Sequence, residues 1–541
     1  MDVNTSFART VVDQFVRDGV REAVVAPGSR SAPLTLAIAN DARLRLHVVV
    51  DERSAAFVAL GIGKATGVPA LLVCTSGTAA AHFHPAVLEA SHAAVPMIVL
   101  TADRPPELIG VGAPQTIDQT NLFGGAVRYF SEPGPPEDHE VGADGARGWR
   151  VLARTAYRSA VGSHPGPVHL NLGFREPLIP SGDEVVLGRP LEGGEPAAAV
   201  VRPIDIALTP KSLVIAGDGA TDSLVSLPSG VPIFADPLSG LRGEPNAITT
   251  FEALLRAGLP SELMPDQVVR LGGLPASSNL GALTGLAVPQ VGVVSRGRRL
   301  DPTRAVTEWI DAPVEFAGEV DQEWANAWTD AERRARAALD AHLLGRESLD
   351  GCAVAALLPT IMSPGSIVTL NSSMAIREWE WVMPRSDVSV LSNRGVNGID
   401  GFIATSCGVA LASGEPVVGI TGDLGFLHDV GSLATLASLR LPSVKIIVND
   451  NDGGGIFEFL PPRTLDEFEQ CFGTPHGLDL AQIVAGFGVG VSHVSSRPDL
   501  AAFLSGNRDG ISVAIMSTDR QSSRALAADL FVAAIRGFQE H

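Results

Sequence analysis

GDLGFLHDV at residues 422–430 and IIVNDNDGGGIF at residues 446–457 are the two segments that best indicate the fold of this 541-residue chain. The first segment follows the apolar run VVGIT (417–421), and the second begins within the apolar run VKIIV (444–448). Such β-branched runs are typical of buried strands. If both strands belong to one parallel sheet, their polar ends lie side by side at its carboxyl edge. The pair therefore predicts an edge rich in Asp, Asn and Gly, without lysine or arginine.

The pattern around these segments occurs twice in the chain. Residues 69–105 and 416–452 each read as an apolar strand, a small turn, a helix, a proline, a second apolar strand and a polar tip. Two earlier pairs of segments align at nearly the same offset: VVAPGSRS (24–31) with VTLNSSMA (368–375), and VVVDERSA (48–55) with SVLSNRGV (389–396). Three pairs of segments in the same order predict two copies of one α/β domain, since chance similarity between generic units would not preserve their order.

Strands that alternate with helices predict parallel sheets whose functional groups lie at the carboxyl ends of the strands. A chain of this length is too long for a single core. A Gly/Pro-rich stretch, EVVLGRPLEGGEP (184–196), separates the first copy from a different set of strand-like segments. We therefore expect an α/β fold of three domains with parallel sheets: residues 1–185 and 346–541 as the duplicated pair, and 186–345 as a middle domain.

The composition limits the partners of the protein. The formal net charge of −20 argues against binding to nucleic acid or to an anionic membrane through bulk charge. The most apolar long stretch, residues 401–422, is interrupted by Gly, Ser, Pro and Glu415, which is unlike a membrane span. The start of the chain lacks the apolar core of a signal peptide, and the four cysteines are scattered. We expect a cytoplasmic protein without nucleic-acid or membrane partners.

The residues at the predicted edge suit a metal ion and a phosphate. Asp and Asn side chains and free carbonyl groups are ligands for Mg²⁺ or Ca²⁺. Glycines let the backbone approach a bound group closely, and amides at a helix N-terminus attract phosphate. Asp423, Asn451 and Gly453 are thus candidates for a metal–diphosphate cradle. The alternative is that Asp423 caps a helix and NDNDGGG is a solvated loop.

A Gly-Asp pair followed at this distance by an Asn-rich strand end resembles the signature of thiamine-diphosphate-dependent enzymes. The resemblance implies that Mg²⁺, with Mn²⁺ as a possible substitute, is bound by the side chains of Asp423 and Asn451 and by the carbonyl of Gly453. The spacing is about one residue longer than usual, which leaves Asp450 as an alternative to Asn451. The remaining residues that the resemblance assigns to thiamine diphosphate are Ile399, Gly422, Leu424 and Ile456.

In the same family, the pyrimidine ring of the cofactor is bound by the first domain copy, usually from a partner chain, and this copy supplies a glutamate. Glu52 follows the predicted strand in VVVDERSAAF and fits that role as the catalytic residue. A carboxyl group hydrogen-bonded to a ring nitrogen favours the tautomer that removes the thiazolium proton. The resemblance implies a homodimer or a dimer of dimers with the site at the interface. The alternative for Glu52 is an ion pair with Arg53.

Six motifs narrow the resemblance: VVAPGSRSAPL, VVVDERSAAF, TSGTAAAHFHPAVLEA, TADRPPELIGVGAPQT, LSNRGVNGIDG and GDLGFLHD. They are similar to the motifs of the 2-succinyl-5-enolpyruvyl-6-hydroxy-3-cyclohexene-1-carboxylate synthases of menaquinone biosynthesis. The implied activity is that of a transferase (carboligase), which decarboxylates 2-oxoglutarate and adds the succinyl carbanion equivalent to isochorismate. The residues implied to face these substrates are Ser29, Arg30, Gln115, Arg377, Arg394, Phe457 and Leu460.

Arginines suit this reaction because they pair with carboxylates through two hydrogen bonds. We assign Arg377 to the distal carboxylate of 2-oxoglutarate, whereas the partners of the other carboxylates stay open. In the middle domain, the loop GGLPASSNLG (272–281) lacks the basic residues common in the family, so either Arg270 or an arginine elsewhere replaces them, or isochorismate is bound in a different way. The alternative function is another thiamine-diphosphate decarboxylase or carboligase, such as an acetolactate synthase.

Overall fold

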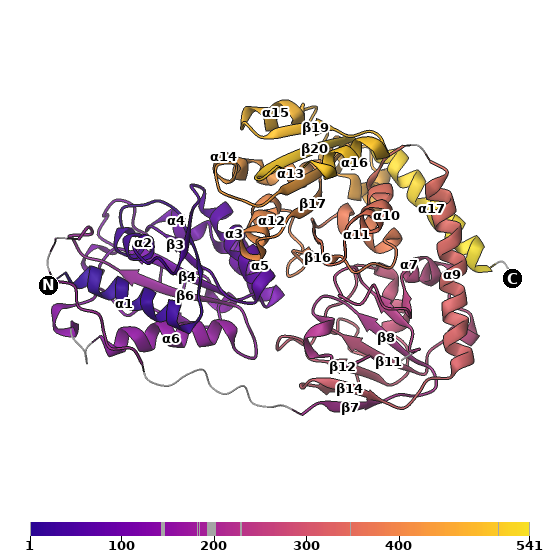
Figure 1. Ribbon diagram of the computed structural model, residues 1–541, viewed down its shortest axis with the longest axis horizontal. Helices are drawn as coiled ribbons and strands as arrows, with labels where there is room; N and C mark the ends of the chain where they lie inside the picture. Colours follow the sequence, from indigo (N-terminus) through magenta and orange to yellow (C-terminus); the bar gives the residue numbers. More distant parts are fainter. Residues whose placement is uncertain are drawn as a thin grey trace.

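The computed structural model describes residues 2–539 except 142–145, 181, 183, 192–201, 228–229, 347 and 507. Its chain forms three α/β domains (Figure 1), as the sequence predicts. The first domain lies on the left of that view, the third at the top, and the middle domain at the lower right. In all three, every ladder between named strands is parallel.

The first domain has a six-stranded sheet in the order β2-β1-β3-β4-β6-β5. Its strands are β1 (Glu22–Val25), β2 (Arg45–Val48), β3 (Leu71–Cys74), β4 (Met97–Asp103), β5 (Phe130–Ser131) and β6 (Pro167–Gly173). Its helices are α1 (Val3–Asp18), α2 (Ala32–Ala39), α3 (Glu52–Thr66), α4 (Thr78–Ala81), α5 (His84–Ala93) and α6 (Arg147–Val161).

The third domain repeats this topology, with the order β16-β15-β17-β18-β20-β19. The equivalent strands confirm the duplication inferred from the sequence. The strands are β15 (Ile367–Leu370), β16 (Ser389–Ser392), β17 (Val417–Gly422), β18 (Val444–Asp450), β19 (Gly490–His493) and β20 (Ile511–Ser517). The helices are α10 (Gly351–Ile361), α11 (Met374–Val382), α12 (Phe402–Ser413), α13 (Asp423–Asp429), α14 (Leu433–Leu436), α15 (Leu480–Gly486), α16 (Arg497–Ser505) and α17 (Arg520–Gln539).

The middle domain has the order β10-β9-β8-β11-β12-β13, with a separate pair formed by β7 and β14. The strand order reverses between β8 and β11, and ligands of open α/β sheets commonly bind at such a switch point. The strands are β7 (Ile204–Ala207), β8 (Ser212–Ala216), β9 (Ile233–Ala235), β10 (Ala247–Ile248), β11 (Gln267–Leu271), β12 (Gln290–Val293), β13 (Glu308–Ile310) and β14 (Val314–Ala317). The helices are α7 (Phe251–Ala257), α8 (Gly281–Thr284) and α9 (Gln322–Leu344).

The hydrophobic cores cross the domain boundaries. One cluster of buried side chains joins α3 of the first domain to α12 of the third. Another joins the middle and third domains and includes Trp328 on α9 and Trp379 on α11, both fully buried. Helices α9 and α17 pack along each other at the right edge of Figure 1. The three sheets are therefore held together by shared apolar surface.

Two glycines let α3 and α12 approach each other at their crossing. A Cβ atom on Gly61 would lie 2.2 Å from the carbonyl oxygen of Thr405, and one on Gly408 would lie 2.2 Å from the carbonyl oxygen of Val58. Both distances are too short for any side chain, since the obstructing atoms belong to helix backbone and cannot move aside as the end of a flexible side chain can. The crossing therefore requires glycine on both helices.

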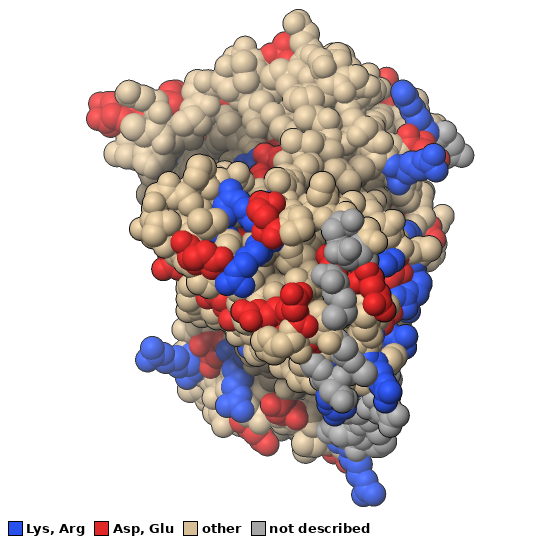
Figure 2. All heavy atoms as spheres, turned by 90° about the vertical axis from the view of Figure 1, so that its left-hand side faces the viewer, with Lys and Arg blue, Asp and Glu red and all other residues tan. Residues whose placement is uncertain are grey.

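The surface of the first domain carries mixed charges. Figure 2 shows Lys and Arg side chains interspersed with Asp and Glu on this face, without a continuous basic area outside the grey residues. Within the described part of the chain, no helix combines the length and the apolar character that crossing a bilayer demands.

We predict that Gly61→Ala lowers the free energy of unfolding by about 1–3 kcal/mol, the usual effect of overpacking a tight contact. Gly148 on α6 is the matched control because it is exposed and a Cβ there would meet no atom within 4 Å. Since alanine favours helix more than glycine, Gly148→Ala should raise stability by up to ~1 kcal/mol. Guanidinium unfolding at one fixed protein concentration measures both. Equal stability of Gly61→Ala and the unchanged protein would contradict the tight crossing.

Candidate active site

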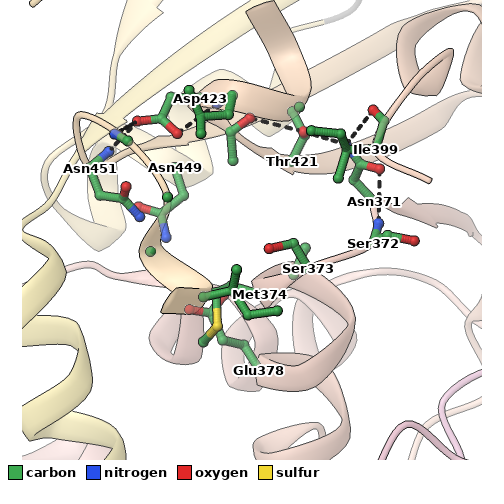
Figure 3. A pocket seen from close by; sticks show the side chains of 18 of the residues that line it. Asn371, Ser372, Ser373, Met374, Glu378, Ile399, Thr421, Asp423, Asn449 and Asn451 are labelled. Atoms are coloured by element: carbon green, nitrogen blue, oxygen red, sulfur yellow. Dashed lines mark hydrogen bonds between the residues drawn. The ribbon is translucent and has the colours of Figure 1, made fainter. Parts of the chain in front are cut away.

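The carboxyl ends of β15, β17 and β18 enclose a pocket of about 170 Å³ in the third domain. The two segments singled out in the sequence do lie side by side there, because β17 and β18 are neighbours in register. In Figure 3, Asp423 and Asn451 lie at one end of the pocket, and Asn371 and Ile399 lie at the other. The lining residues are Asn371–Ala375, Glu378, Ile399, Ile420–Gly425, Asn449, Asn451 and Gly453–Phe457.

Asp423 joins the two segments through its carboxylate. It is 1% exposed and is the first residue of α13. Its Oδ1 accepts the N–H of Leu424 at 2.7 Å, and its Oδ2 accepts the N–H groups of Asn451 at 3.2 Å and Gly453 at 2.7 Å. A buried carboxylate is stable only when such donors surround it. Asp423 thus binds an amide in the first turn of its own helix and also fixes the loop that follows β18.

Asn451 and Asp450 have different environments. Among the described residues, the Oδ1 atom of Asn451 is buried without a hydrogen-bond partner, and Asn451 lines the pocket. Asp450 does not line it, and its Oδ1 accepts the N–H of Asp452 at 3.4 Å. Burial and the neighbouring charge of Asp423 raise the pKa of Asp450. The oxygen that lacks a hydrogen-bond partner therefore belongs to Asn451, and such a free oxygen is what a cation ligand requires.

Gly453 also has a conformation that only glycine adopts easily. Its φ is +136°, and a Cβ atom on it would lie 2.0 Å from the carbonyl oxygen of Gly473. Any other residue would push the loop away from Asp423, so the glycine string holds the backbone close to the acidic edge.

Two helix N-termini supply backbone amides to the pocket. Helix α13 begins at Asp423, and α11 begins after Ser373, which has a φ of +76°. Amides at these positions have no partner within their helix and attract phosphate. Asn371 connects the two sides, since its Nδ2 donates to Thr421 Oγ1 at 2.9 Å. The pocket can thus hold a diphosphate between the two helices.

Apolar side chains form the rest of the wall. Ile399, Ile456 and Phe457 line the pocket as predicted, together with the unpredicted Met374. Leu460 is 41% exposed and does not line it, because the short 3₁₀ helix at Gly455–Phe459 ends before it and carries the chain outward.

Glu378 on α11 is a further lining residue that the sequence did not indicate. Its side chain lies on the wall opposite Asn371 (Figure 3). Burial, followed by the charge of Asp350, raises its pKa to about 8, so that this carboxyl group is mainly protonated near neutral pH.

The predicted residues of the first domain lie elsewhere. Glu52 begins α3, with Asp51 as the helix cap. Burial, followed by the charge of Glu52, raises the pKa of the Cys74 thiol. Glu52 is half-buried and does not line the pocket of its own chain. The alternative ion pair with Arg53 is not formed, since Arg53 donates to the carbonyl of His428 at 3.0 Å and faces Asp429 at 3.8 Å.

Ser29, Arg30 and Gln115 also lie at the carboxyl edge of the first sheet. Ser29 is exposed, and Arg30 is buried, donating to the carbonyl of Phe174 at 2.8 Å while facing Glu176 at 3.4 Å. Gln115 donates to the carbonyl of Ser76 at 3.1 Å. None of the three lines the third-domain pocket, so within one chain these residues lie outside the site at Asp423.

A second cavity, of about 560 Å³, lies between the middle and third domains. It opens at the switch point of the middle sheet, where Asp218 follows β8 and Gly273 follows β11. Arg394 of the third domain lines this cavity rather than the first one. Arg377 lines neither of the two, but it lies near Arg394, whose charge lowers its pKa after the larger effect of burial.

The arginines of the middle domain differ in their contacts. Arg270 is 4% exposed, pairs with Asp301 at 2.8 Å and binds Gln290, so it is a structural residue. Arg298 and Arg299 line the cavity instead. They follow β12 in the segment SRGRRL, and their two adjacent positive charges next to a strand end were the signal available in the sequence.

Two regions of the chain match known protein families. Residues 5–122 match the family described as thiamine pyrophosphate enzyme, N-terminal TPP binding domain. Residues 377–512 match the family described as thiamine pyrophosphate enzyme, C-terminal TPP binding domain. These regions coincide with the duplicated first and third domains.

Three relatives are similar over nearly the full length, and each is named 2-succinyl-5-enolpyruvyl-6-hydroxy-3-cyclohexene-1-carboxylate synthase. The protein from Thermobifida fusca is 40% identical, over 97% of this chain and 98% of the relative. Those from Saccharopolyspora erythraea and Geobacillus kaustophilus are 39% and 38% identical, over 99% and 90% of each chain. The chain therefore belongs to the family of thiamine-pyrophosphate-dependent 2-succinyl-5-enolpyruvyl-6-hydroxy-3-cyclohexene-1-carboxylate synthases.

Proposed function

We propose that the protein decarboxylates 2-oxoglutarate and transfers the remaining four-carbon fragment to isochorismate, in menaquinone biosynthesis. The observation that carries this proposal is the full-length similarity to synthases of that name, combined with the third-domain pocket at Asp423. When bound, thiamine diphosphate supplies the carbanion chemistry that breaks the bond to the leaving carboxylate and forms the new carbon–carbon bond.

The residues of the pocket fit a metal-bound diphosphate. We propose that Asp423, Asn451 and the carbonyl of Gly453 bind Mg²⁺, for which Mn²⁺ can substitute. The unpartnered Oδ1 of Asn451 supports this choice over Asp450. Gly422 and Leu424 flank the same edge, while Ile399 and Ile456 provide apolar contact for the cofactor rings and exclude water.

We propose that a second copy of the chain completes the site and supplies Glu52. The pocket of one chain has no first-domain residue among its described lining, which supports a homodimer with the site at the interface. Glu52 would then hydrogen-bond a ring nitrogen of the pyrimidine and hold the proton there. Ser29, Arg30 and Gln115 lie at the same edge of the first sheet and would reach the substrates with it.

The arginines divide between the two substrates. Arg377 and Arg394 repel each other, and burial weakens the hydration of Arg377, so a carboxylate between them relieves both costs. We propose that Arg377 binds the distal carboxylate of 2-oxoglutarate. The larger cavity, with Arg298, Arg299 and Arg394, would receive the two carboxylates of isochorismate and gives the middle domain a role in binding. Phe457 would form the apolar wall between them.

The defining experiment mixes the purified protein with thiamine diphosphate, Mg²⁺, 2-oxoglutarate and isochorismate and analyses the product by mass. We expect the succinyl adduct of isochorismate, and we expect its loss after dialysis against a chelator and its return with Mg²⁺ and cofactor. Acetolactate formed from pyruvate alone would instead favour an acetolactate synthase. Full activity of the stripped protein would contradict the cofactor assignment.

Mixing two inactive variants tests whether the site is shared between chains. Glu52→Gln keeps the shape of the side chain but cannot drive the tautomer shift, and should cost roughly 10²–10⁴-fold in turnover. Asp423→Ala should abolish cofactor binding. If each site takes Glu52 from one chain and Asp423 from the other, random re-association into dimers restores about one quarter of full activity. No recovery, despite proven exchange of subunits, would place both residues in one chain.

The substrate assignment predicts that two arginine variants impair the use of different substrates. Arg377→Ala should lower the specificity constant for 2-oxoglutarate by about 10- to 100-fold, the value of a charge-assisted hydrogen-bonded pair, with little change for 2-oxobutyrate. Arg299→Ala should raise the KM for isochorismate by a similar factor. Arg296→Ala is the matched control, because Arg296 does not line the cavity and already pairs with Asp222 at 2.6 Å. Steady-state kinetics with each substrate varied decides it, and equal losses for both oxoacids would contradict the role of Arg377.

A further inference from the structure

A histidine outside the predicted motifs lies against the acidic edge. His476 is in the loop before α15, and its side chain is 10% exposed. Its Nε2 is 3.3 Å from Asp423 Oδ2 and 3.7 Å from Asp450 Oδ1. The backbone N–H groups of His476 and Gly477 both donate to Asp452 Oδ1, at 2.9 and 2.8 Å. The loop is therefore fastened to the segment that follows β18.

The hydrogen bonds of the ring assign its tautomer. The backbone N–H of Leu478 donates to His476 Nδ1 at 3.0 Å, and a backbone amide is always a donor. Nδ1 must then be an acceptor without a proton. In the neutral ring the other nitrogen carries the proton, so Nε2 donates toward Asp423 Oδ2.

This donor completes the set around one oxygen of Asp423. Oδ2 faces three donors, from Asn451, Gly453 and His476, whereas Oδ1 accepts only the N–H of Leu424. A carboxylate oxygen has two lone pairs, so Oδ2 is fully used and Oδ1 keeps one lone pair free. The oxygen available to a cation is therefore Oδ1.

We propose that His476 is a positioning residue of the metal site, which holds the Asp423 carboxylate so that Oδ1 is available to the cation and thereby sets the affinity for the metal. The inference rests on the proposed cofactor of this pocket. Outer partners of this kind orient metal ligands in many proteins, and their loss typically costs about 10- to 100-fold in metal affinity. Asp423, Asp450 and His476 also have ligand-type atoms within 4.8 Å of one another, so direct ligation by His476 is the competing role.

Three substitutions at His476 separate these roles. Calorimetric titration of Mn²⁺ into stripped protein with saturating thiamine diphosphate measures the affinity. We expect His476→Ala to weaken Mn²⁺ binding by about 10- to 100-fold. His476→Gln should recover most of the loss, because its amide nitrogen takes the place of Nε2 as a donor. His476→Asn should not recover it, since its shorter side chain does not reach Asp423. His493→Ala is the control, an exposed histidine of the same domain at the end of β19.

Pulsed electron paramagnetic resonance of bound Mn²⁺ tests direct ligation. We expect no strong coupling to an imidazole nitrogen. Such a coupling, lost in His476→Ala, would overturn the proposal and make His476 a ligand. Equal Mn²⁺ affinity of the His476→Ala and unchanged proteins would also overturn it, as would equal weakening in the Ala and Gln variants, which indicates a merely structural role. Failure of the unchanged protein to bind Mn²⁺ with the cofactor would instead overturn the proposed function.

Discussion

The site of the third domain depends on one buried carboxylate. Asp423 is enclosed at the start of α13, where only hydrogen bonds can compensate for the loss of water around its charge. The donors come from the other strand end, the N–H groups of Asn451 and Gly453, so satisfying the carboxylate also fixes the loop after β18. The same contacts therefore stabilise the charge of Asp423 and shape the loop after β18, and neither can change without the other.

The same sheet topology serves two purposes in this chain. The third domain presents an acidic edge and two helix N-termini, whereas the equivalent edge of the first domain presents Glu52 and Arg30. The two copies are joined at the crossing of α3 and α12, where Gly61 and Gly408 let the two backbones come into contact. The two copies thus share one topology and differ in the residues at the carboxyl ends of their strands.

The sequence predicts the parts of this site that lie in two consecutive strand–turn–helix units. Asp423, Asn451 and Gly453 belong to two adjacent units. In each unit the apolar strand, the glycines and the polar strand end lie close together in the sequence and can be recognised there. His476 was not predictable in this way, because it returns to the edge from a loop beyond β18, where tertiary packing alone decides the position. Leu460 lies outside the pocket of one chain, and its position was not predictable for a related reason, since the direction of the chain after a 3₁₀ helix is not encoded in hydrophobic periodicity.

Acidic side chains lie near Arg377 and Arg394 and set the local balance of charge. Arg377 and Arg394 are like charges close together, which is unfavourable in the free protein. Glu380 lies on the same helix as Arg377, three residues further on, and burial and the nearby charge of Asp236 raise its pKa. Asp236 in turn is stabilised by the charge of Arg394, after the larger opposing effect of its burial. The repulsion between the arginines is therefore only partly offset by the acids behind them, and the remaining field attracts carboxylates. On the proposed assignment of Arg377 to the distal carboxylate of 2-oxoglutarate, this repulsion would favour an oxoacid with a second carboxylate over one without it, so an electrostatic cost in the free protein would become selectivity in the complex.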